Sequence, residues 1–586
     1  MAFGTLIGER AGKHLPAVLA ESRRALVLVA ILSAFLNILL LGGPLYLMLI
    51  YDSVMPSGSK ASLFGLLIMI AGVYLFQGVF DVLRSRILGD VASLFDRRLS
   101  GQVHRFVTDV RTRVAGDGDG MTPVRDLDAI RSFLSGPGPG ALLDLPWIIM
   151  FLALLTLLHF WLGVTAVLGA LVLIMLTWMN DRMSRDATQR TARAYSGRGR
   201  VMQDSRRQGE LVRALGMRER MQARWQRTND EYLAEQYRLA RLTGTFGASS
   251  KIFRMFLQSV VLSVGALLYL AGEASGGIVF AASILSSRAL APVDQAIANW
   301  RGFTAARQGW VRLEALLDRM SRFRDPETRL PQPEQSLVVE ALAVAPPGAH
   351  GPILRGLNFK LQAGDALGIV GPSAAGKTSL IRTLVGIWPP LAGDVRIDGA
   401  ALDNWDPDLL GAHIGYVPQT VELFEGTISE NIARFDPAAT SEGVIAAAKA
   451  AGVHEMVLRL DAGYDTVLTG EGNELSAGQR QRLGLARALY GDPFFVVLDE
   501  PNSNLDMDGE TALQEAIKGL RARRAITVIV AHRPTALAHV SKVAVIKDGT
   551  LAEFGDRDDV FQKLGLAPAG ATSNLPPGRV EVVRAK

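Results

Sequence analysis

Residues 365–387 read DALGIVGPSAAGKTSLIRTLVGI, and this stretch decides the fold of the second half of the chain. The apolar run 365–370 predicts a short buried strand, 371–379 a glycine-bearing loop, and the residues after it a helix. This order is the phosphate-loop pattern, in which backbone amides of the loop and of the helix start surround phosphate oxygens. We therefore expect a nucleotide site, where Lys377 neutralises the terminal phosphates and Thr378 presents its hydroxyl to Mg²⁺. The predicted phosphate contacts are Gly371, Pro372, Ser373, Ala374, Ala375, Gly376, Lys377, Thr378 and Ser379.

A second apolar run, FFVVLDE at 494–500, predicts a central parallel strand that ends in two acids. At that strand end, Asp499 can hold Mg²⁺ through water. Glu500 can orient and polarise the attacking water, which is the role of a general base in phosphoanhydride hydrolysis. Strand-end acids alone are weak evidence, but together with the phosphate loop they predict ATP hydrolysis.

The first half of the 586-residue chain is strongly apolar. Residues 25–50 carry no charge, and a helix of that length reaches about 39 Å, enough to cross a bilayer. A signal peptide is the alternative for this stretch, but its apolar core would be twice the usual length and no small-residue cleavage site follows. We predict six membrane-spanning helices, at about 25–50, 61–80, 141–159, 162–180, 254–272 and 276–298.

The domain organisation follows from the change in composition after Trp300. We expect an all-helical membrane domain followed by an α/β ATPase domain with a parallel sheet. The predicted parts are an N-terminal segment at 1–24, the membrane domain at 25–300, a linker at 301–335, the ATPase domain at 336–565 and a flexible tail at 566–586.

Lys and Arg residues between the spans predict the orientation in the membrane. The first 24 residues hold four of them, 81–140 hold nine and 181–251 hold sixteen, whereas the opposite connections hold only Lys60. Both termini and the ATPase domain should therefore be cytoplasmic. This asymmetry also explains much of the net charge of +5, so lipid and not nucleic acid is the expected surface partner.

The segment LSAGQRQRLGLARAL at 475–489 resembles the LSGGQ signature of the ATP-binding cassette (ABC) family. Gln419 in YVPQ, the segment SNLD after Glu500, and His532 after the strand ITVIVA follow the order of that family's motifs. The resemblance implies a homodimer with two ATP molecules between two cassettes. It implies that Gln419 joins Thr378 and Asp499 at Mg²⁺, and that His532 contacts the γ-phosphate in catalysis with Glu500 and Lys377. The implied signature, which acts on the partner subunit's ATP, is Leu475, Ser476, Ala477, Gly478 and Gln479, and the implied D-loop is Ser503, Asn504, Leu505 and Asp506.

Two positions depart from the family pattern. Ala477 stands where a second glycine is usual, a modest change if this position does not need a positive φ. The family's adenine-stacking aromatic, about twenty-five residues before the phosphate loop, is replaced by LAVAPPGAHG, with Pro346 near that place. The resemblance therefore does not say how adenine is held.

Two further segments, GPLYLMLIYDSVMPSGS at 43–59 and LDLPWIIMFL at 143–152, resemble the type I protein secretion ATPases of Gram-negative bacteria. This resemblance implies ATP-driven export of an unfolded polypeptide with a C-terminal signal across the inner membrane. The implied partners are a periplasmic membrane-fusion adaptor, an outer-membrane tunnel protein and the secreted cargo. The alternatives are an exporter of lipids or amphiphilic small molecules, and a membrane-anchored ABC ATPase that acts as a regulator or assembly platform without transport.

The chain contains 0 Cys, which excludes disulfides, thiolate metal sites and a cysteine nucleophile. We therefore expect no leader-cleaving peptidase of the kind that some related exporters carry ahead of the first span. Arg288 and Asp294 in the last span have two interpretations. They mark a transport path, or the helix reaches its cytoplasmic end there and Arg288 extends to the interface, and we favour the second.

Overall fold

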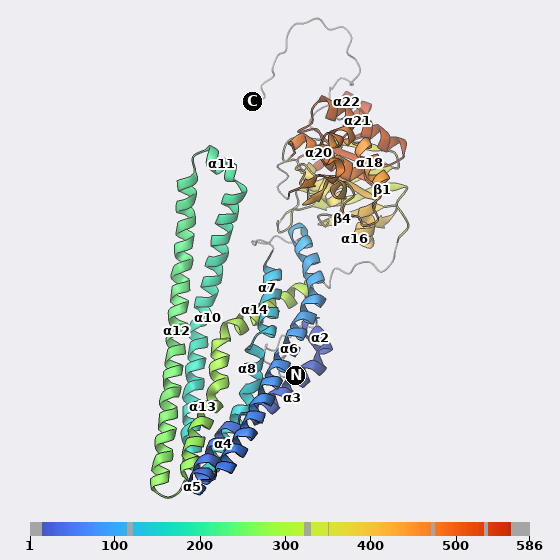
Figure 1. The fold of residues 1–586 in the computed structure, drawn as a ribbon. Helices are drawn as coiled ribbons and strands as arrows, with labels where there is room; N and C mark the ends of the chain where they lie inside the picture. Colours follow the sequence, from blue (N-terminus) through green and yellow to red (C-terminus); the bar gives the residue numbers. More distant parts are fainter. Residues whose placement is uncertain are drawn as a thin grey trace. The chain divides into compact units, whose positions relative to one another are not determined.

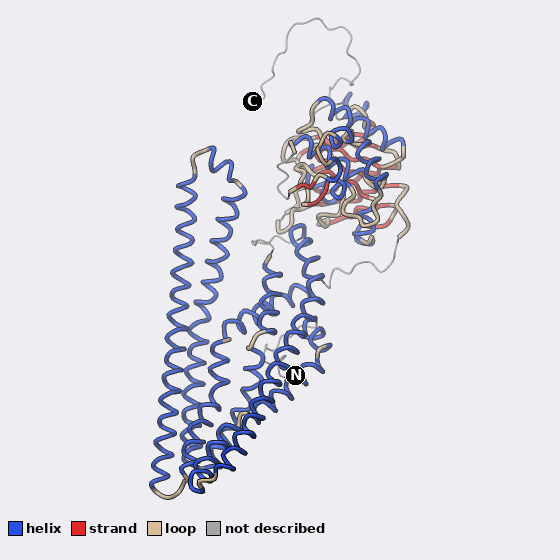
Figure 2. The backbone as a smooth tube through the Cα atoms, in the orientation of Figure 1, coloured by secondary structure: helices blue, strands red, loops and turns tan. Residues whose placement is uncertain are grey.

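The computed structural model describes residues 14–113, 121–320, 330–349, 351–469, 475–531 and 537–563. The chain divides into two compact units, one of residues 1–108 and 117–322, the other of residues 109–116 and 323–586. Strands are confined to the second unit, and the described residues of the first are helices and their connections (Figure 2). Parts of the predicted N-terminal segment and linker, and the whole of the predicted tail, lie outside the described residues.

Six described helical segments are long and apolar enough to cross a membrane, as the sequence predicts. Hydrocarbon leaves no partner for a backbone amide or carbonyl except within the helix itself, which explains the all-helical form. The elements of this unit are α2 (His14–Glu21), α3 (Arg23–Leu39), α4 (Gly42–Leu49), the π-turn η1 (Ile50–Val54), α5 (Met55–Ser57), α6 (Lys60–Arg113), α7 (Thr122–Ser135), α8 (Gly138–Asp144), η2 (Leu145–Trp147), α9 (Ile148–Leu158), α10 (Phe160–Arg207), α11 (Gly209–Ala214), α12 (Arg218–Leu270), α13 (Gly276–Ala298) and α14 (Trp300–Met320).

Helices α6, α10 and α12 run far beyond the predicted spans, over 54, 48 and 53 residues. At about 1.5 Å per residue each is roughly twice as long as a bilayer is thick. Figure 1 shows α10 and α12 side by side, joined at their far end by α11. The uncharged stretch around residue 159 breaks at His159, whose extended backbone ends α9 and whose ring nitrogen accepts a hydrogen bond from Trp161 N at 3.3 Å.

A polar cluster ties three helices together inside the membrane unit. Asp144, at the end of α8, accepts hydrogen bonds from Ser33 at 2.5 Å and Asn37 at 2.8 Å, both on α3. Arg84 of α6 forms an ion pair with the same carboxylate at 3.0 Å. Ser33 and Asn37 are almost completely buried, so each must find a partner within the protein, and this shared carboxylate supplies it.

Helix α14 is fixed by contacts with three other elements. Arg312 donates two hydrogen bonds to the buried Asp126 of α7, at 2.9 and 2.5 Å. Trp310 stacks on Phe95 of α6 with ring centroids 5.8 Å apart. The buried Glu314 accepts a hydrogen bond from the backbone N–H near the start of α2 at 2.8 Å. These contacts join the end of the membrane unit to its N-terminal helix.

The second unit is built on two sheets. One contains six strands in the order β12-β11-β3-β10-β9-β6, parallel except for β12, and the other is antiparallel in the order β2-β1-β4-β5. The runs predicted as strands form the centre of the parallel sheet, where β9 and β10 are completely buried. Since parallel strands end at one edge, the phosphate loop after β3 and the acids after β9 meet there.

The strands are β1 (Ser336–Val344), β2 (Leu354–Gln362), β3 (Ala366–Val370), β4 (Ala392–Ile397), β5 (Ala400–Ala401), β6 (Ile414–Val417), β7 (Gly426–Thr427), β8 (Val467–Leu468), β9 (Phe495–Asp499), β10 (Ile526–Val530), β11 (Lys542–Lys547) and β12 (Thr550–Asp556). The helices are α15 (Lys377–Leu384), η3 (Leu402–Asn404), α16 (Pro407–Ala412), α17 (Ile428–Ile432), α18 (Ser441–Ala450), α19 (His454–Leu458), η4 (Gly463–Asp465), α20 (Ala477–Leu489), α21 (Met507–Ala522) and α22 (Arg557–Lys563). Two apolar clusters, one on each face of the parallel sheet, form the core of this unit.

Arg312→Gln should destabilise the membrane unit, because it leaves Asp126 buried with its main cationic partner removed. A hydrogen-bonded charge of this kind contributes about 1–3 kcal/mol. Thermal unfolding of the purified full-length protein in detergent measures the loss. Arg307→Gln, at an exposed position on the same helix, is the matched control. Equal melting temperatures for the two variants would show that the Arg312–Asp126 ion pair does not stabilise the membrane unit.

Candidate functional site

The phosphate loop lies between β3 and α15, as the sequence predicts. Lys377 is the first residue of α15, is only 5% exposed, and donates hydrogen bonds to the carbonyls of Gly371 and Pro372, both at 2.8 Å. Gly376 has a φ of +96°, and a Cβ added there would lie 2.8 Å from Leu354. Only glycine fits this turn without strain.

The acids at the end of β9 influence the pKa of Lys377. Burial lowers the pKa of Lys377, and the nearby carboxylates of Glu500 and Asp499 oppose this shift. The Lys377 ammonium group thus lies, partly desolvated, between the loop carbonyls and the two acids. A phosphate that binds there would replace the hydrogen bonds to the carbonyls with stronger, charge-assisted hydrogen bonds.

Asp499 is the last residue of β9 and is 1% exposed. Neither carboxylate oxygen has a hydrogen-bond partner of normal geometry among the described residues. Burial raises the pKa of this carboxyl group, while Thr378, Arg382 and Lys377 oppose the shift. A buried carboxylate beside a hydroxyl group and a phosphate loop has the hard oxygen donors that Mg²⁺ prefers.

Two residues that the sequence did not single out complete the surroundings of Asp499. Arg382, on α15, lies against the ring of Trp388 at 5.0 Å, and its charge opposes the raised pKa of Tyr416 of β6. Burial raises the pKa of Tyr416, and the Asp499 charge adds to this shift. Arg382 therefore supplies positive charge behind the carboxylate. Its position in an ordinary amphipathic helix gave no signal for this role.

Glu500 follows β9 in a left-handed backbone conformation, with a φ of +51°. Its N–H donates to the carbonyl of Val530 at 3.0 Å, which continues the pairing between β9 and β10 by one residue. Its carboxylate accepts a hydrogen bond from Gln419 Nε2 at 3.2 Å. The structure thus brings together two predicted site residues that lie 81 positions apart in the chain.

The signature segment forms the N-terminus of α20. Ser476 is the N-cap and exchanges hydrogen bonds with Gln479 in a capping box, at 3.2 and 2.8 Å. Ala477 is the first residue of the helix and needs no positive φ, so an alanine fits where the family usually has glycine. The flanking Leu475 is buried and anchors the segment to the core.

The signature helix contacts the end of β9 through Gln481, which the sequence did not identify. Gln481 is 4% exposed, donates to the carbonyl of Glu500 at 3.2 Å and accepts from the N–H of Asn504 at 3.1 Å. Beside it, a Cβ on Gly478 would lie 2.7 Å from the Asn504 carbonyl. One buried amide therefore fixes the predicted general base and the D-loop relative to the signature.

The rest of the D-loop continues from this junction into α21. Ser503 N–H donates to the carbonyl of Glu500 at 3.2 Å, and Leu505 packs against the core. Asp506 caps α21 by accepting from Gly509 N–H at 2.9 Å, and Arg482 of α20 lies 3.7 Å from its carboxylate. The turn therefore has contacts with both α20 and α21.

Two positions singled out from the sequence gain no nucleotide contact from the described residues. His532 lies outside the described residues. Pro346 lies in the turn after β1, where its carbonyl accepts a hydrogen bond from Ala349 N–H at 3.0 Å, a geometry that assigns no contact to adenine.

Comparison with known proteins identifies the family. Residues 354–503 match the family model of ABC transporters, and residues 26–293 match that of the ABC transporter transmembrane region. The type I secretion system ATP-binding protein PrsD of Rhizobium meliloti (strain 1021) is 48% identical over 545 residues, which cover 93% of this chain and 94% of that protein. The chain belongs to the ABC transporters of type I secretion systems.

Two further comparisons agree with this membership. The leukotoxin translocation ATP-binding protein LktB of Mannheimia haemolytica is 28% identical over 553 residues, covering 94% of this chain and 78% of that protein. The structure of a bacterial Atm1-family ABC exporter with ATP bound matches with a TM-score of 0.78 at 23% identity, covering 93% of this chain and 97% of that one, which shows a shared fold. The predicted family and fold class are thus confirmed. As an ABC transporter, the chain couples ATP hydrolysis to transport across a membrane that it spans several times.

Gln481→Met should lower kcat for ATP hydrolysis about tenfold and change KM less than about threefold, because losing hydrogen bonds worth roughly 1.4 kcal/mol misplaces the general base. Gln481→Glu keeps the hydrogen-bond acceptor for the Asn504 N–H. Its kcat should therefore lie between those of Gln481→Met and the wild type. Steady-state ATPase assays of the full-length protein measure both constants. Gln514→Met on α21 is the control for loss of an amide. An unchanged kcat in Gln481→Met would remove the proposed positioning role.

Proposed function

We propose that this chain is the ATPase motor of a type I secretion system and exports an unfolded polypeptide with a C-terminal signal. The observation that carries the proposal is the 48% identity, over 93% of the chain, to a protein named as the ATP-binding protein of such a system. A second relative is named for translocation of leukotoxin. The alternatives, an exporter of lipids or amphiphiles and a regulator without transport, have no comparable support among these relatives.

The motor is proposed to work as a homodimer. Each ATP would bind the phosphate loop of one subunit and the signature of the other, with the amide and hydroxyl of Ser476 and the amide of Gly478 directed at the γ-phosphate. The buried junction at Gln481 supports this arrangement, because it joins the signature that would serve one ATP to the general base that would serve the other. His532 is proposed as a further contact of the γ-phosphate.

Within each site, Lys377 would neutralise the terminal phosphates of ATP. Asp499, Thr378 and Gln419 are proposed to hold Mg²⁺, and the unpartnered buried oxygens of Asp499 fit such an ion. When bound, the ion would neutralise charge on the phosphate oxygens. Glu500, already oriented by Gln419 and by its own backbone pairing, would accept a hydrogen bond from the attacking water and align it with the γ-phosphate.

We place the protein in the bacterial inner membrane, with both termini and the ATPase domain in the cytoplasm. The Lys and Arg distribution supports this orientation. A periplasmic membrane-fusion adaptor and an outer-membrane tunnel protein would complete the export path. The short connections at the opposite ends of the spans, such as the turn at His159, would then face the adaptor.

Glu500→Gln should abolish secretion while ATP still binds, because the amide cannot polarise the attacking water. Secreted cargo should fall at least about a hundredfold, and the variant should accumulate as an ATP-bound dimer. Quantitative immunoblotting of the medium and size-exclusion chromatography of the ATP-loaded protein measure these effects. Glu442→Gln, at an exposed position on α18, is the control. Unchanged secretion by Glu500→Gln would refute the motor assignment.

A further inference from the structure

The junction between α13 and α14 contacts both long helices of the α10–α12 hairpin. Helix α13 ends at Ala298, and α14 starts at Trp300 in a new direction (Figure 1). The indole N–H of Trp300 donates a hydrogen bond to Asp181 of α10 at 2.7 Å. The next residue, Arg301, donates to the hydroxyl of Thr243 of α12 at 2.6 Å. Two consecutive residues thus bind the two helices of the hairpin, and we call these four residues the clasp.

We propose that the clasp holds the α10–α12 hairpin in position against α14, and that Asp181 is the positioning residue through which ATP hydrolysis is coupled to movement of the spans. Helix α14 is followed in the chain by the linker and the ATPase unit, whereas α10 and α12 each contain one of the candidate spans. A fixed contact between α14 and the hairpin therefore transmits movement between them. The inference rests on the proposed export function and names a contact that export would require.

The donor side of the clasp is held firmly on α14. The Trp300 ring packs on Phe303 with centroids 5.2 Å apart, and Phe303 packs on Phe133 of α7 at 5.7 Å. Further along α14, Arg312 donates to the buried Asp126 of α7. These contacts leave the indole N–H little freedom, so it has a defined direction toward α10.

The acceptor side of the clasp is a buried charge. Asp181 directly follows the predicted span 162–180 and is 9% exposed. One of its oxygens accepts from Trp300, and the other accepts from Nε of Arg185 at 2.8 Å, one turn further along α10. A buried carboxylate depends on such donors, and a hydrogen bond to a charged acceptor is stronger than one between neutral groups. The contact between Asp181 and Trp300 is therefore the stronger half of the clasp.

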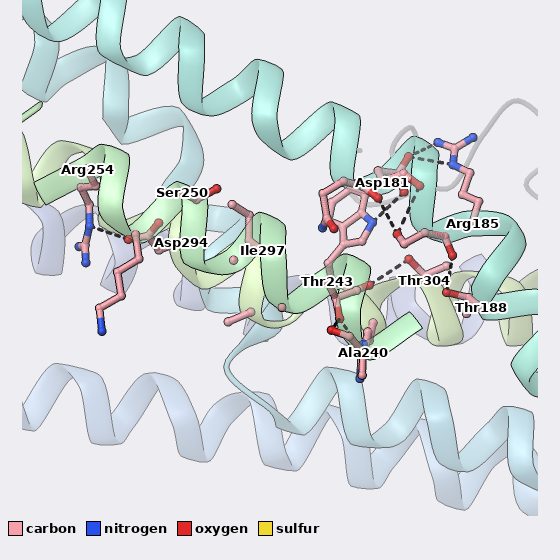
Figure 3. Close-up of a pocket in the computed structure, with 18 residues that line it drawn as sticks. Asp181, Arg185, Thr188, Ala240, Thr243, Ser250, Arg254, Asp294, Ile297 and Thr304 are labelled. Atoms are coloured by element: carbon pink, nitrogen blue, oxygen red, sulfur yellow. Dashed lines mark hydrogen bonds and ion pairs between the residues drawn. The ribbon is translucent and has the colours of Figure 1, made fainter. Parts of the chain in front are cut away.

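A cavity of about 550 Å³ lies at the level of the clasp, among α10, α12, α13 and α14, and all four clasp residues line it (Figure 3). The buried apolar residues of the spans and those around α14 form two separate clusters. Figure 3 shows Asp181 and Thr243 at the cavity, with dashed lines to the residues that hold them. Because the cavity interrupts apolar packing here, polar contacts have to fix the hairpin to the junction.

The two ionisable residues of the last span differ in their surroundings. Asp294 lies one turn before the end of α13 and forms an ion pair with Arg254 of α12 at 2.9 Å, at the other end of the cavity (Figure 3). Arg288 does not lie at a helix end, because α13 continues to Ala298. It lines a smaller cavity, together with Tyr46, Tyr74 and Gln77. The helix-end interpretation that we favoured from the sequence therefore fits Asp294 and is wrong for Arg288.

A distance measurement on the full-length protein in nanodiscs tests the positioning role. Because the chain has no native Cys, spin labels can be placed at Ala234→Cys on α12 and Ala305→Cys on α14, both exposed positions. Double electron–electron resonance then gives the distribution of the distance between hairpin and α14. Asp181→Leu should widen this distribution at least about twofold, and Trp300→Phe, which removes only the indole N–H, should do the same. The double variant should be no wider than either single variant, since both remove one contact.

Transport per ATP tests the coupling role. Asp181→Leu should lower secreted cargo per ATP hydrolysed about tenfold, while kcat and KM of the ATPase change less than about twofold. Asp181→Asn keeps an oxygen acceptor for Trp300, so its coupling should lie between those of Asp181→Leu and the parent. Asp186→Asn, at an exposed position on the same helix, is the control and should behave as the parent.

Three results would overturn the proposal. An unchanged distance distribution in Asp181→Leu would show that the clasp does not position the hairpin. A parallel loss of secretion and ATPase activity would show general damage and remove the coupling role. An equal loss in Asp186→Asn would show that any change of charge on α10 has this effect. Absence of secretion by the parent would count against the export function itself, and the distance measurement would still decide whether the clasp positions the hairpin.

Discussion

The cost of burying a polar atom without a partner shapes both units of this protein. In the membrane unit it requires the backbone to be helical, and it pairs Arg84 with Asp144 and Arg312 with Asp126. In the ATPase unit it draws the Lys377 ammonium group onto two carbonyls of its own loop. Unpartnered atoms also occur within packed regions, at the indoles of Trp310 and Trp405 for example. Those at Asp499 differ, because they lie beside a phosphate loop.

The ATPase site is positioned largely by backbone. Asp499 and Glu500 end a completely buried strand, the left-handed turn at Glu500 is held by pairing with β10, and Gln481 binds that turn from the signature helix. The end of β9, the D-loop and the signature helix are thus joined by direct hydrogen bonds within one subunit. We therefore expect ATP to act mainly on the arrangement of the two proposed subunits.

The sequence predicted those parts of the fold whose signal is local. Strand, loop and helix at 365–387 follow one another in the chain, and uncharged stretches such as 25–50 mark spans by length alone. Gln481 and Arg382 were missed because their roles depend on which strand their helices pack against, and no pattern within either helix records that. The pairing of Arg254 with Asp294 is equally nonlocal, since the residues lie on different helices. Ala477 departs from the family's usual glycine. The sequence alone did not show that this position is the start of a helix, where no special backbone conformation is needed.

We expect the buried carboxylate of Asp499 to make ATP hydrolysis by this motor depend on Mg²⁺. Mg²⁺ titration of the ATP-loaded full-length Glu500→Gln protein, with and without Asp499→Asn, tests it most directly. We predict that Asp499→Asn weakens Mg²⁺ binding at least about tenfold and leaves metal-free ATP binding unchanged, since a neutral amide replaces a charged ligand. Because burial raises the pKa of Asp499, its carboxylate protonates at a higher pH than an ordinary aspartate, so Mg²⁺ affinity should fall earlier as the pH is lowered. Equal Mg²⁺ affinity with and without Asp499→Asn would contradict the claim.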